Sequence, residues 1–236
     1  MQAWLLVVAM LVSVVTGIGT TKTAKAATKM GVTYTVHVQT YGDQQGWVHD
    51  GTMAGTKGQA KRLEEIRVKL TGDEYSGSIQ YKTHIQSYGW QDWSYNGEKS
   101  GSRGQAKRLE GIEIQLTGEV AKHYDVVYRV HCQTYGWMDW VKNGVMAGTS
   151  GQAKRLEAIR ISLYGEMAEH YDIYYRVHAQ SFGWLSWAKN GEASGTAGLA
   201  KRLEGIQIIL VPKGSPEPGR TYDNITATNT VSFIRR

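Results

Sequence analysis

The feature that most constrains this chain is a unit of about 47 residues that occurs four times. The tetrapeptide Lys-Arg-Leu-Glu returns at 61–64, 107–110, 154–157 and 201–204. On the surrounding matches, the four copies span residues 32–71, 79–118, 126–165 and 173–211. A single unit of this size cannot bury its own apolar face. We therefore expect the copies to pack against one another and to share one core.

Each copy begins and ends with a segment in which apolar and polar residues alternate. In the third copy, Tyr128, Val130 and Cys132 share one face of the first segment, and Ile159 and Ile161 share one face of the last. This period of two predicts strands with one buried side. Hairpin-turn dipeptides lie between them, as Asp-Gly at 50–51 and Asn-Gly at 96–97, 143–144 and 190–191. We expect about three strands per copy, with one helical turn at most in the linkers 119–123 and 166–170.

The pattern predicts an all-β fold in a shared-core, pseudosymmetric arrangement that is trefoil-like or prism-like. Such closed forms leave no unpaired sheet edge. Four copies do not match a three-fold closure. We therefore expect the fourth copy to cap the fold, to undergo domain swapping, or to make the closure four-fold. The repeat ends at Leu210. Residues 212–219 have the composition of a linker, and residues 221–236 are expected to be disordered or to add one strand.

The first residues resemble a leader segment. An apolar run from Ala3 to Val15 is followed by Ala24-Lys25-Ala26, a small-residue cleavage pattern. Residues 1–26 are therefore predicted to be a signal peptide, leaving a repeat domain at 27–211 and a linker with a short tail at 212–236. The alternative is a retained membrane anchor, because the stretch Ala3 to Gly19 is nearly long enough to span a bilayer. After cleavage no membrane span is expected.

Charge and cysteine content exclude some classes of function. The formal net charge is +6, and Lys22 and Lys25 of the predicted leader contribute two of these charges. Such a small, dispersed excess suits adhesion to an anionic cell wall or membrane surface but does not indicate nucleic acid. Cys132 is the one cysteine, so neither an intrachain disulfide nor a cysteine-based metal site is expected. Its counterparts, Val38, Ile85 and Ala179, are apolar, which predicts a buried thiol.

The motifs within each copy identify a family resemblance. The third and fourth copies carry a Tyr-x-Val-His-x-Gln strand, a Trp-x-x-Trp pair, Asn-Gly, Gly-Thr and Arg-Leu-Glu-x-Ile-x-Ile. This pattern resembles the Clostridial hydrophobic W (ChW) repeat family over residues 32–211. The resemblance implies secretion from a Gram-positive bacterium and a non-catalytic role in binding polysaccharide, cell wall or other surface partners. The first copy departs from the pattern, because residues 41–47 lack the first tryptophan and carry one extra residue.

The tryptophans are the candidate ligand-binding residues. Exposed indole rings stack on sugars and anchor protein interfaces, whereas buried ones form a hydrophobic centre. The second position is kept in all four copies and is predicted to lie in the core. The first position is absent from copy 1, so the fold tolerates its loss and it is the better binding candidate. The first-position residues are Trp90, Trp137 and Trp184, and the second-position residues are Trp47, Trp93, Trp140 and Trp187.

Two recurrent polar groups have structural and functional interpretations. The histidines His37, His84, His131 and His178 recur every 47 residues on the polar strand face. They could converge on an axis and bind metal. No copy contains a second recurrent ligand at suitable spacing, so we expect hydrogen bonds within each copy and no metal or cofactor. The Lys-Arg-Leu-Glu block is either a basic contact surface or, as we prefer, a structural pairing of its arginine with its glutamate.

Catalytic motifs are absent from the sequence. It contains no Gly-x-Ser-x-Gly elbow, phosphate loop or His-Glu-x-x-His, and its recurrent glutamate is copied four times in one context. Catalytic acids are usually single and differ in environment. We therefore expect a secreted or cell-surface binding protein rather than an enzyme such as a small hydrolase. Its repeated sites would bind polysaccharide, cell wall or a surface protein multivalently. The alternative is a structural or protein–protein interaction module of the cell surface.

Overall fold

A computed structural model describes residues 31–236, except 44–45, 58, 60, 73–74 and 223. The predicted signal peptide, residues 1–26, lies outside the described residues and stays a prediction. Among the helices that are described, none is long and apolar enough to cross a membrane.

Each copy forms one long antiparallel hairpin, as the alternating segments predict. The hairpins are β1 (Gly31–Val38) with β4 (Leu63–Thr71), β5 (Gly77–Ile85) with β9 (Leu109–Gly118), β10 (Tyr124–Cys132) with β14 (Leu156–Gly165), and β15 (Tyr171–Ala179) with β19 (Leu203–Pro212). In every hairpin the register shifts by one residue directly after the recurrent histidine. Such an irregularity bends the end of a hairpin, and here it bends all four copies at the same place.

Short strands in the loop of each hairpin build the rest of the sheet. Those that pair with the first strand of their own copy are β2 (Val48–His49), β6 (Gly89–Trp90), β7 (Ser94–Tyr95), β11 (Gly136–Trp137), β12 (Val141–Lys142), β16 (Gly183–Trp184) and β17 (Ala188–Lys189). A further short strand of each loop pairs with the preceding copy instead. These lent strands are β3 (Ala54–Gly55), β8 (Ser100–Gly101), β13 (Ala147–Gly148) and β18 (Ser194–Ala197).

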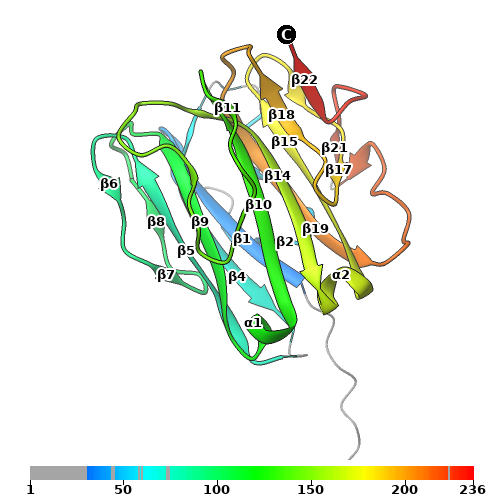
Figure 1. Cartoon of the computed structure of the whole chain (residues 1–236). Coiled ribbons are helices and arrows are strands. Elements are labelled where there is room, and N and C mark those ends of the chain that lie inside the picture. The colour runs from blue at the N-terminus through cyan, green and yellow to red at the C-terminus, as the bar shows by residue number, and fades with distance from the viewer. Residues whose placement is uncertain (1–30, 44–45, 58, 60, 73–74, 223) are drawn as a thin grey trace, which may run out of the picture.

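The lent strands close the four copies into a ring. β8 pairs with β4, β13 with β9 and β18 with β14, while β3 of copy 1 pairs with β19 of copy 4. The result is a propeller-like ring of four small sheets (Figure 1). The closure is therefore four-fold, which settles the alternatives that the sequence left open. The all-β, pseudosymmetric class is confirmed.

A glycine makes each lent strand possible. A Cβ atom on Gly148 would lie 2.5 Å from the carbonyl oxygen of Glu110, and one on Gly195 would lie 2.4 Å from that of Glu157. Both glycines also adopt positive φ angles, of 125° and 134°. Only a residue without a side chain permits this approach, which explains why each lent strand contains a glycine.

Buried tyrosines join neighbouring copies, and the apolar core is shared. The hydroxyl of Tyr128 accepts a hydrogen bond from the Ile114 amide of copy 2 at 2.7 Å and donates to the Val145 carbonyl at 2.7 Å. Burial raises the pKa of Tyr128, so this hydroxyl keeps its proton. Tyr34 contacts the Ile208 amide of copy 4 in the same way at 3.0 Å. One core cluster combines residues of copies 2, 3 and 4, with partly buried residues of copy 1 packed against it.

The segments outside the hairpins form single helical turns and short strands. The linkers form single turns, α1 (Val120–His123) and α2 (Glu166–His170). After β19 come β20 (Thr221–Tyr222), β21 (Ile225–Thr226) and β22 (Phe233–Arg235). β22 adds a parallel strand to β18, so the tail supplies one added strand to the main sheets. The tail lies beside copy 4 (Figure 1). Cys132 is buried as predicted, and burial raises its pKa to about 11.

Candidate functional site

The two tryptophans of copies 2, 3 and 4 hold a cation between them. In copy 3 the guanidinium carbon of Arg129 lies 5.2 Å from the ring centroid of Trp137 and 4.7 Å from that of Trp140. Lys82 lies 5.1 Å from Trp90 and 4.9 Å from Trp93 in copy 2, and Arg176 lies 5.6 Å from Trp184 and 4.6 Å from Trp187 in copy 4. These are cation–π distances. We call each cation with its two indoles a Trp face.

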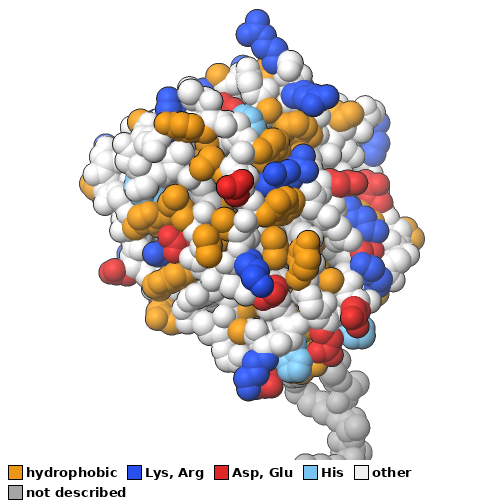
Figure 2. Space-filling model, viewed as in Figure 1, with side chains coloured by type: hydrophobic (Ala, Val, Ile, Leu, Met, Phe, Trp, Pro, Cys, Tyr) orange, Lys and Arg blue, Asp and Glu red, His pale blue; other side chains and the backbone are white. Residues whose placement is uncertain are grey.

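Strand alternation explains where the Trp faces lie. Arg129 is adjacent to the buried Tyr128 on β10, and successive side chains of a strand point to opposite sides. The tyrosine therefore points into the ring and the arginine points away from it. Figure 2 shows hydrophobic side chains next to Lys and Arg side chains across this side of the molecule.

The first tryptophan of each pair packs within its own copy. Trp137 meets His131 edge-on with 5.5 Å between ring centroids, and Trp90 and Trp184 meet their histidines at 5.5 and 5.6 Å. A Cβ atom on Gly111 would lie 3.2 Å from the Trp90 ring. The strand position beneath this indole must therefore be small. It is Gly111, Ala158 or Gly205 in copies 2, 3 and 4.

The second tryptophan lies at the junction with the following copy. The ring of Trp140 is 3.4 Å from a Cβ atom placed on Gly191, and that of Trp47 is 3.1 Å from one placed on Gly97. Both glycines belong to the hairpin-turn dipeptides of the next copy. The side chains of Trp47 and Trp140 are 41% and 42% exposed, so the predicted core position is wrong for them. They pack on the neighbouring turn from outside, because the interior is already filled by the tyrosine face of the strands.

The C-terminal tail covers the Trp face of copy 4. The indole N–H of Trp187 donates to the Gly219 carbonyl at 3.1 Å, and the Arg176 guanidinium donates to the Arg220 and Ile225 carbonyls at 3.1 and 3.0 Å. Trp187 is only 5% exposed, and Trp184 and Arg176 are completely buried, so the predicted binding candidate Trp184 is not accessible. Burial lowers the pKa of Arg176 to about 10. This guanidinium is thus held by neutral acceptors of the tail.

The Trp faces of copies 2 and 3 remain accessible to solvent. Trp90, Trp93 and Trp137 are partly buried, and Trp140 is exposed. The tail reaches only the edge of copy 3, where Phe233 lies 5.7 Å from Trp137 between ring centroids.

Copy 1 has a charged network where the other copies have a Trp face. Its strand carries Thr35 at the cation position. The buried Glu65 accepts hydrogen bonds from Arg67 at 2.8 Å and from Arg103 of copy 2 at 3.0 Å. Arg103 also pairs with Asp43. Sequence reasoning missed this network, although comparison of the copies contained its signal, since Glu65 stands where the other copies have glycine or alanine.

The preferred structural interpretation of the arginine and glutamate is confirmed. The pairs Arg62–Glu64, Arg108–Glu110, Arg155–Glu157 and Arg202–Glu204 are separated by 3.2, 3.1, 3.2 and 3.0 Å. The carboxylates are 0–2% exposed.

The recurrent histidines lie behind these carboxylates. Nδ1 of His84, His131 and His178 is 3.3–3.4 Å from the second glutamate oxygen. Nε2 of His84 also accepts a hydrogen bond from the Gly151 amide of the next copy at 3.2 Å. The sequence did not predict this contact between copies. Within the part of the chain that the structure describes, no group of three or more His, Cys, Asp or Glu side chains is arranged to hold a metal ion.

The lent strands and the outward Trp faces define a class of protein, the closed ring of tandem β repeats. A family model described as Clostridial hydrophobic W matches residues 37–72, 84–118, 131–165 and 178–212. The chain belongs to this family, which confirms the resemblance drawn from the motifs. The comparison with curated proteins finds no match, and the comparison with solved structures finds none.

Proposed function

We propose that this chain is a secreted, non-catalytic protein of the bacterial cell surface that binds extended polymers on the Trp faces of copies 2 and 3. One observation carries the proposal. The equivalent face of copy 4 is already filled by the chain itself, through the Gly219 carbonyl and the small hairpin of β20 and β21. This part of the tail displays the chemistry such a face accepts, which is a series of acceptor oxygens placed against the cation and the indole N–H.

A protein segment is the ligand that this observation favours. A peptide backbone presents carbonyl oxygens, as the tail does in copy 4, and Arg129 and Lys82 supply donors like those of Arg176. Tryptophan and arginine are also the residues that most often dominate binding at protein interfaces. The structural or interaction role that the sequence left as an alternative is therefore the first choice for the ligand.

Polysaccharide is the second candidate, and the exposed rings of copy 3 favour it. Trp140 is exposed, and Tyr135 in the same loop is 54% exposed. Flat aromatic rings of this kind pack against the C–H faces of sugars, and sugar hydroxyls can accept the same hydrogen bonds as carbonyls. For either ligand, two faces on one chain would raise the apparent affinity through a high effective concentration.

The test compares two tryptophans that are equally exposed. Trp140→Ala removes a ring from an open Trp face, whereas Trp47→Ala removes a ring from copy 1, which has no such face. Retention of the full chain on cell walls of its producer is measured by sedimentation. We expect Trp140→Ala to weaken retention about tenfold, the loss typical of an interface anchor, and Trp47→Ala to leave it unchanged. Equal behaviour of the two variants would contradict the proposal.

A second arm of the test separates the two ligand classes. Cell walls are treated with protease in one sample and left intact in another, and purified peptidoglycan and a glycan array are tested beside them. Loss of retention after protease treatment identifies a protein ligand. Retention on protease-treated walls or on glycans identifies polysaccharide.

A further inference from the structure

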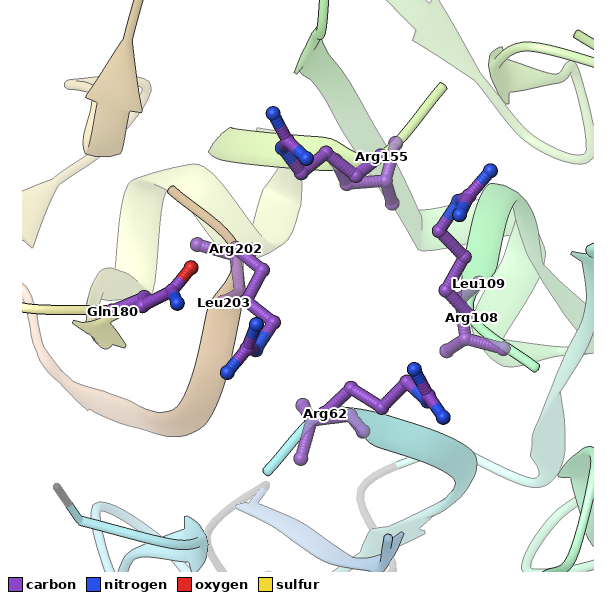
Figure 3. A pocket seen from close by; sticks show the side chains of 9 residues that line it. Arg62, Arg108, Leu109, Arg155, Gln180, Arg202 and Leu203 are labelled. Atoms are coloured by element: carbon purple, nitrogen blue, oxygen red, sulfur yellow. The ribbon is translucent and has the colours of Figure 1, made fainter. Parts of the chain in front are cut away.

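Four arginines, one from each copy, stand around a single opening on the pseudo-four-fold axis (Figure 3). They are Arg62, Arg108, Arg155 and Arg202. The opening leads to a hollow of about 210 Å³ whose wall is completed by Leu63, Leu109, Leu156, Leu203 and Gln180. The arginine side chains are 28–30% exposed in all four copies. We call this set of four the arginine ring.

A repeated turn sets the position of each arginine. The main-chain carbonyl of Arg108 accepts a hydrogen bond from the Gln86 amide at 3.0 Å, and the other three copies have the same bond at 3.0–3.1 Å. The alanine two residues before the arginine adopts a left-handed conformation in Ala106, Ala153 and Ala200, with φ of 55–57°. Alanine is strained there, and such a conformation persists only where the surroundings impose it. The ring is therefore held in a defined geometry.

The ring keeps hydrogen-bond donors that its glutamates do not use. Arg62 and Arg155 contact Glu64 and Glu157 through Nε, and the described residues provide no hydrogen-bond acceptor for their terminal nitrogens. Arg108 donates one terminal nitrogen to the Ala153 carbonyl of the next copy at 2.7 Å. A guanidinium has five N–H donors, so Arg62 and Arg155 at the opening keep donors that no described residue engages.

The charge at this end of the ring is positive. Each arginine pairs with one glutamate of its own copy, and these carboxylates are buried, so the excess of positive charge comes from the neighbouring lysines. A lysine precedes each arginine, and its ammonium group lies 3.1–3.3 Å from a hydroxyl of the same copy. These pairs are Lys61–Thr40, Lys107–Ser87, Lys154–Thr134 and Lys201–Ser181. Each copy therefore brings one lysine and one arginine, against one buried glutamate, to this end of the ring. A concave surface with an excess of one sign concentrates counter-ions.

We propose that the arginine ring binds one multivalent phosphate oxyanion per chain, of the chemical class of pyrophosphate. Guanidinium groups engage phosphate oxygens in pairs of parallel hydrogen bonds, and the leucine floor excludes water from one side of the site. A carboxylate has two oxygens and cannot meet four guanidinium groups at once, whereas a pyrophosphate has enough terminal oxygens to do so. This site is separate from the Trp faces and does not depend on their proposed role.

Isothermal titration of the full chain with sodium pyrophosphate at low ionic strength tests the stoichiometry. We expect one site per chain, because the four copies share one axis, and an affinity that falls as salt is added. Four sites per chain would place binding on the individual copies and overturn the proposal. Absence of binding would also overturn it and leave the arginines with their structural role alone.

Substitutions then locate the site. Arg155→Gln is expected to weaken pyrophosphate binding about tenfold or more, because it removes charge-assisted hydrogen bonds. The control Lys99→Gln removes the same charge from an exposed side chain and should change the affinity less than about twofold. Arg155→Lys keeps the charge but not the planar pair of donors, and we expect it to bind with intermediate affinity.

A double variant serves as the control for loss of folding. Arg155→Gln leaves Glu157 buried without its partner, which is destabilising. Arg155→Gln/Glu157→Gln removes both charges together and keeps the buried site neutral. Circular dichroism verifies the fold of each protein. Pyrophosphate binding by the double variant as tight as that of the wild type, or equal weakening by Lys99→Gln, would overturn the assignment.

Discussion

Copies 3 and 4 carry the same Trp face in opposite environments. Each has an arginine between two indoles, at nearly equal distances. Yet Trp140 is 42% exposed in copy 3, and its counterpart in copy 4 is 5% exposed. The difference comes from the tail that follows the repeat, which lays its carbonyl oxygens on the guanidinium of Arg176. Whether a Trp face is open is therefore decided by what covers it and not by the repeat.

The comparison with copy 1 shows a third outcome. In copy 1 the first indole is missing, and an ionic network of Glu65 and Arg103 occupies its place. Burial alone would raise the pKa of Asp43 in this network, but hydrogen bonds from His37 and Arg103 hold it below its ordinary value. The ring tolerates the loss of an indole because Glu65 of copy 1, paired with Arg103 of the next copy, fills the same position.

The largest expected difference between copies 3 and 4 concerns their arginines. Arg176→Ala leaves two tail carbonyls and the Gln207 side chain without a buried donor and opens a cavity, so we expect a loss of about 3 kcal/mol. Arg129→Ala removes mainly a solvent-accessible cation–π contact and should cost about 1 kcal/mol or less. Urea unfolding of both variants measures the two losses. Equal losses would mean that the tail adds nothing to the stability of copy 4.

A smaller difference is expected for the aspartates at the start of β10 and β15. Burial by itself would raise the pKa of Asp172, but hydrogen bonds from Lys189, Asn190, the Gly214 amide and Lys213 outweigh it and hold the pKa far below its ordinary value. A carboxylate with a depressed folded-state pKa stabilises the fold fully above its unfolded pKa near 4, and this contribution is lost as the pH falls further. At pH 7, Asp172→Asn should cost about 2 kcal/mol.

The counterpart in copy 3 provides the control. Asp125 is partly exposed, and hydrogen bonds from Asn143 and Lys142 lower its pKa without help from the tail. Asp125→Asn should therefore cost about 1 kcal/mol or less at pH 7. Unfolding free energies are measured from pH 7 to pH 2.5. The deficit of Asp172→Asn should shrink below about pH 4, and a deficit that stays constant to pH 2.5 would contradict the assignment.

The smallest difference is expected for two glycines in the Trp-bearing loops. Gly136 and Gly183 have φ angles of 77° and 76°, so alanine costs about 1 kcal/mol at either position. Only at Gly183 does a Cβ atom meet the tail, because the hydroxyl oxygen of Thr228 would lie 2.3 Å away. Thr228 donates to the Trp184 carbonyl at 2.9 Å, and its displacement breaks that bond. Gly183→Ala should therefore lower stability by about 1 kcal/mol more than Gly136→Ala. Thermal unfolding compares the variants. Indistinguishable midpoints would show that the tail accommodates the added methyl group without loss of stability.

Much of the fold and part of the candidate site could be predicted because each copy serves as a control for the others. Alternation along β10 and β14 identified the strands, and the apolar counterparts of Cys132 identified its burial. The pairing of Arg108 with Glu110 was predicted from their spacing of two residues, which places both side chains on one side of an extended chain. The tryptophans were harder to place, because an indole suits a core and a surface equally well. Trp140 rests on the turn at Gly191, which belongs to the next copy, and no pattern within one copy reveals this contact.

The sequence by itself determined the repeat, the strands, the buried side of each strand and the arginine–glutamate pairs, because these depend on neighbours along the chain. Only the tertiary structure decided the four-fold closure, the covering of Trp187 and the meeting of four arginines on one axis. Each of these depends on contacts between distant residues, such as the pairing of Ala54 with Ile206 that closes the ring. Alternation along a strand determines which side of it is buried, but the packing of the copies determines what lies against that side.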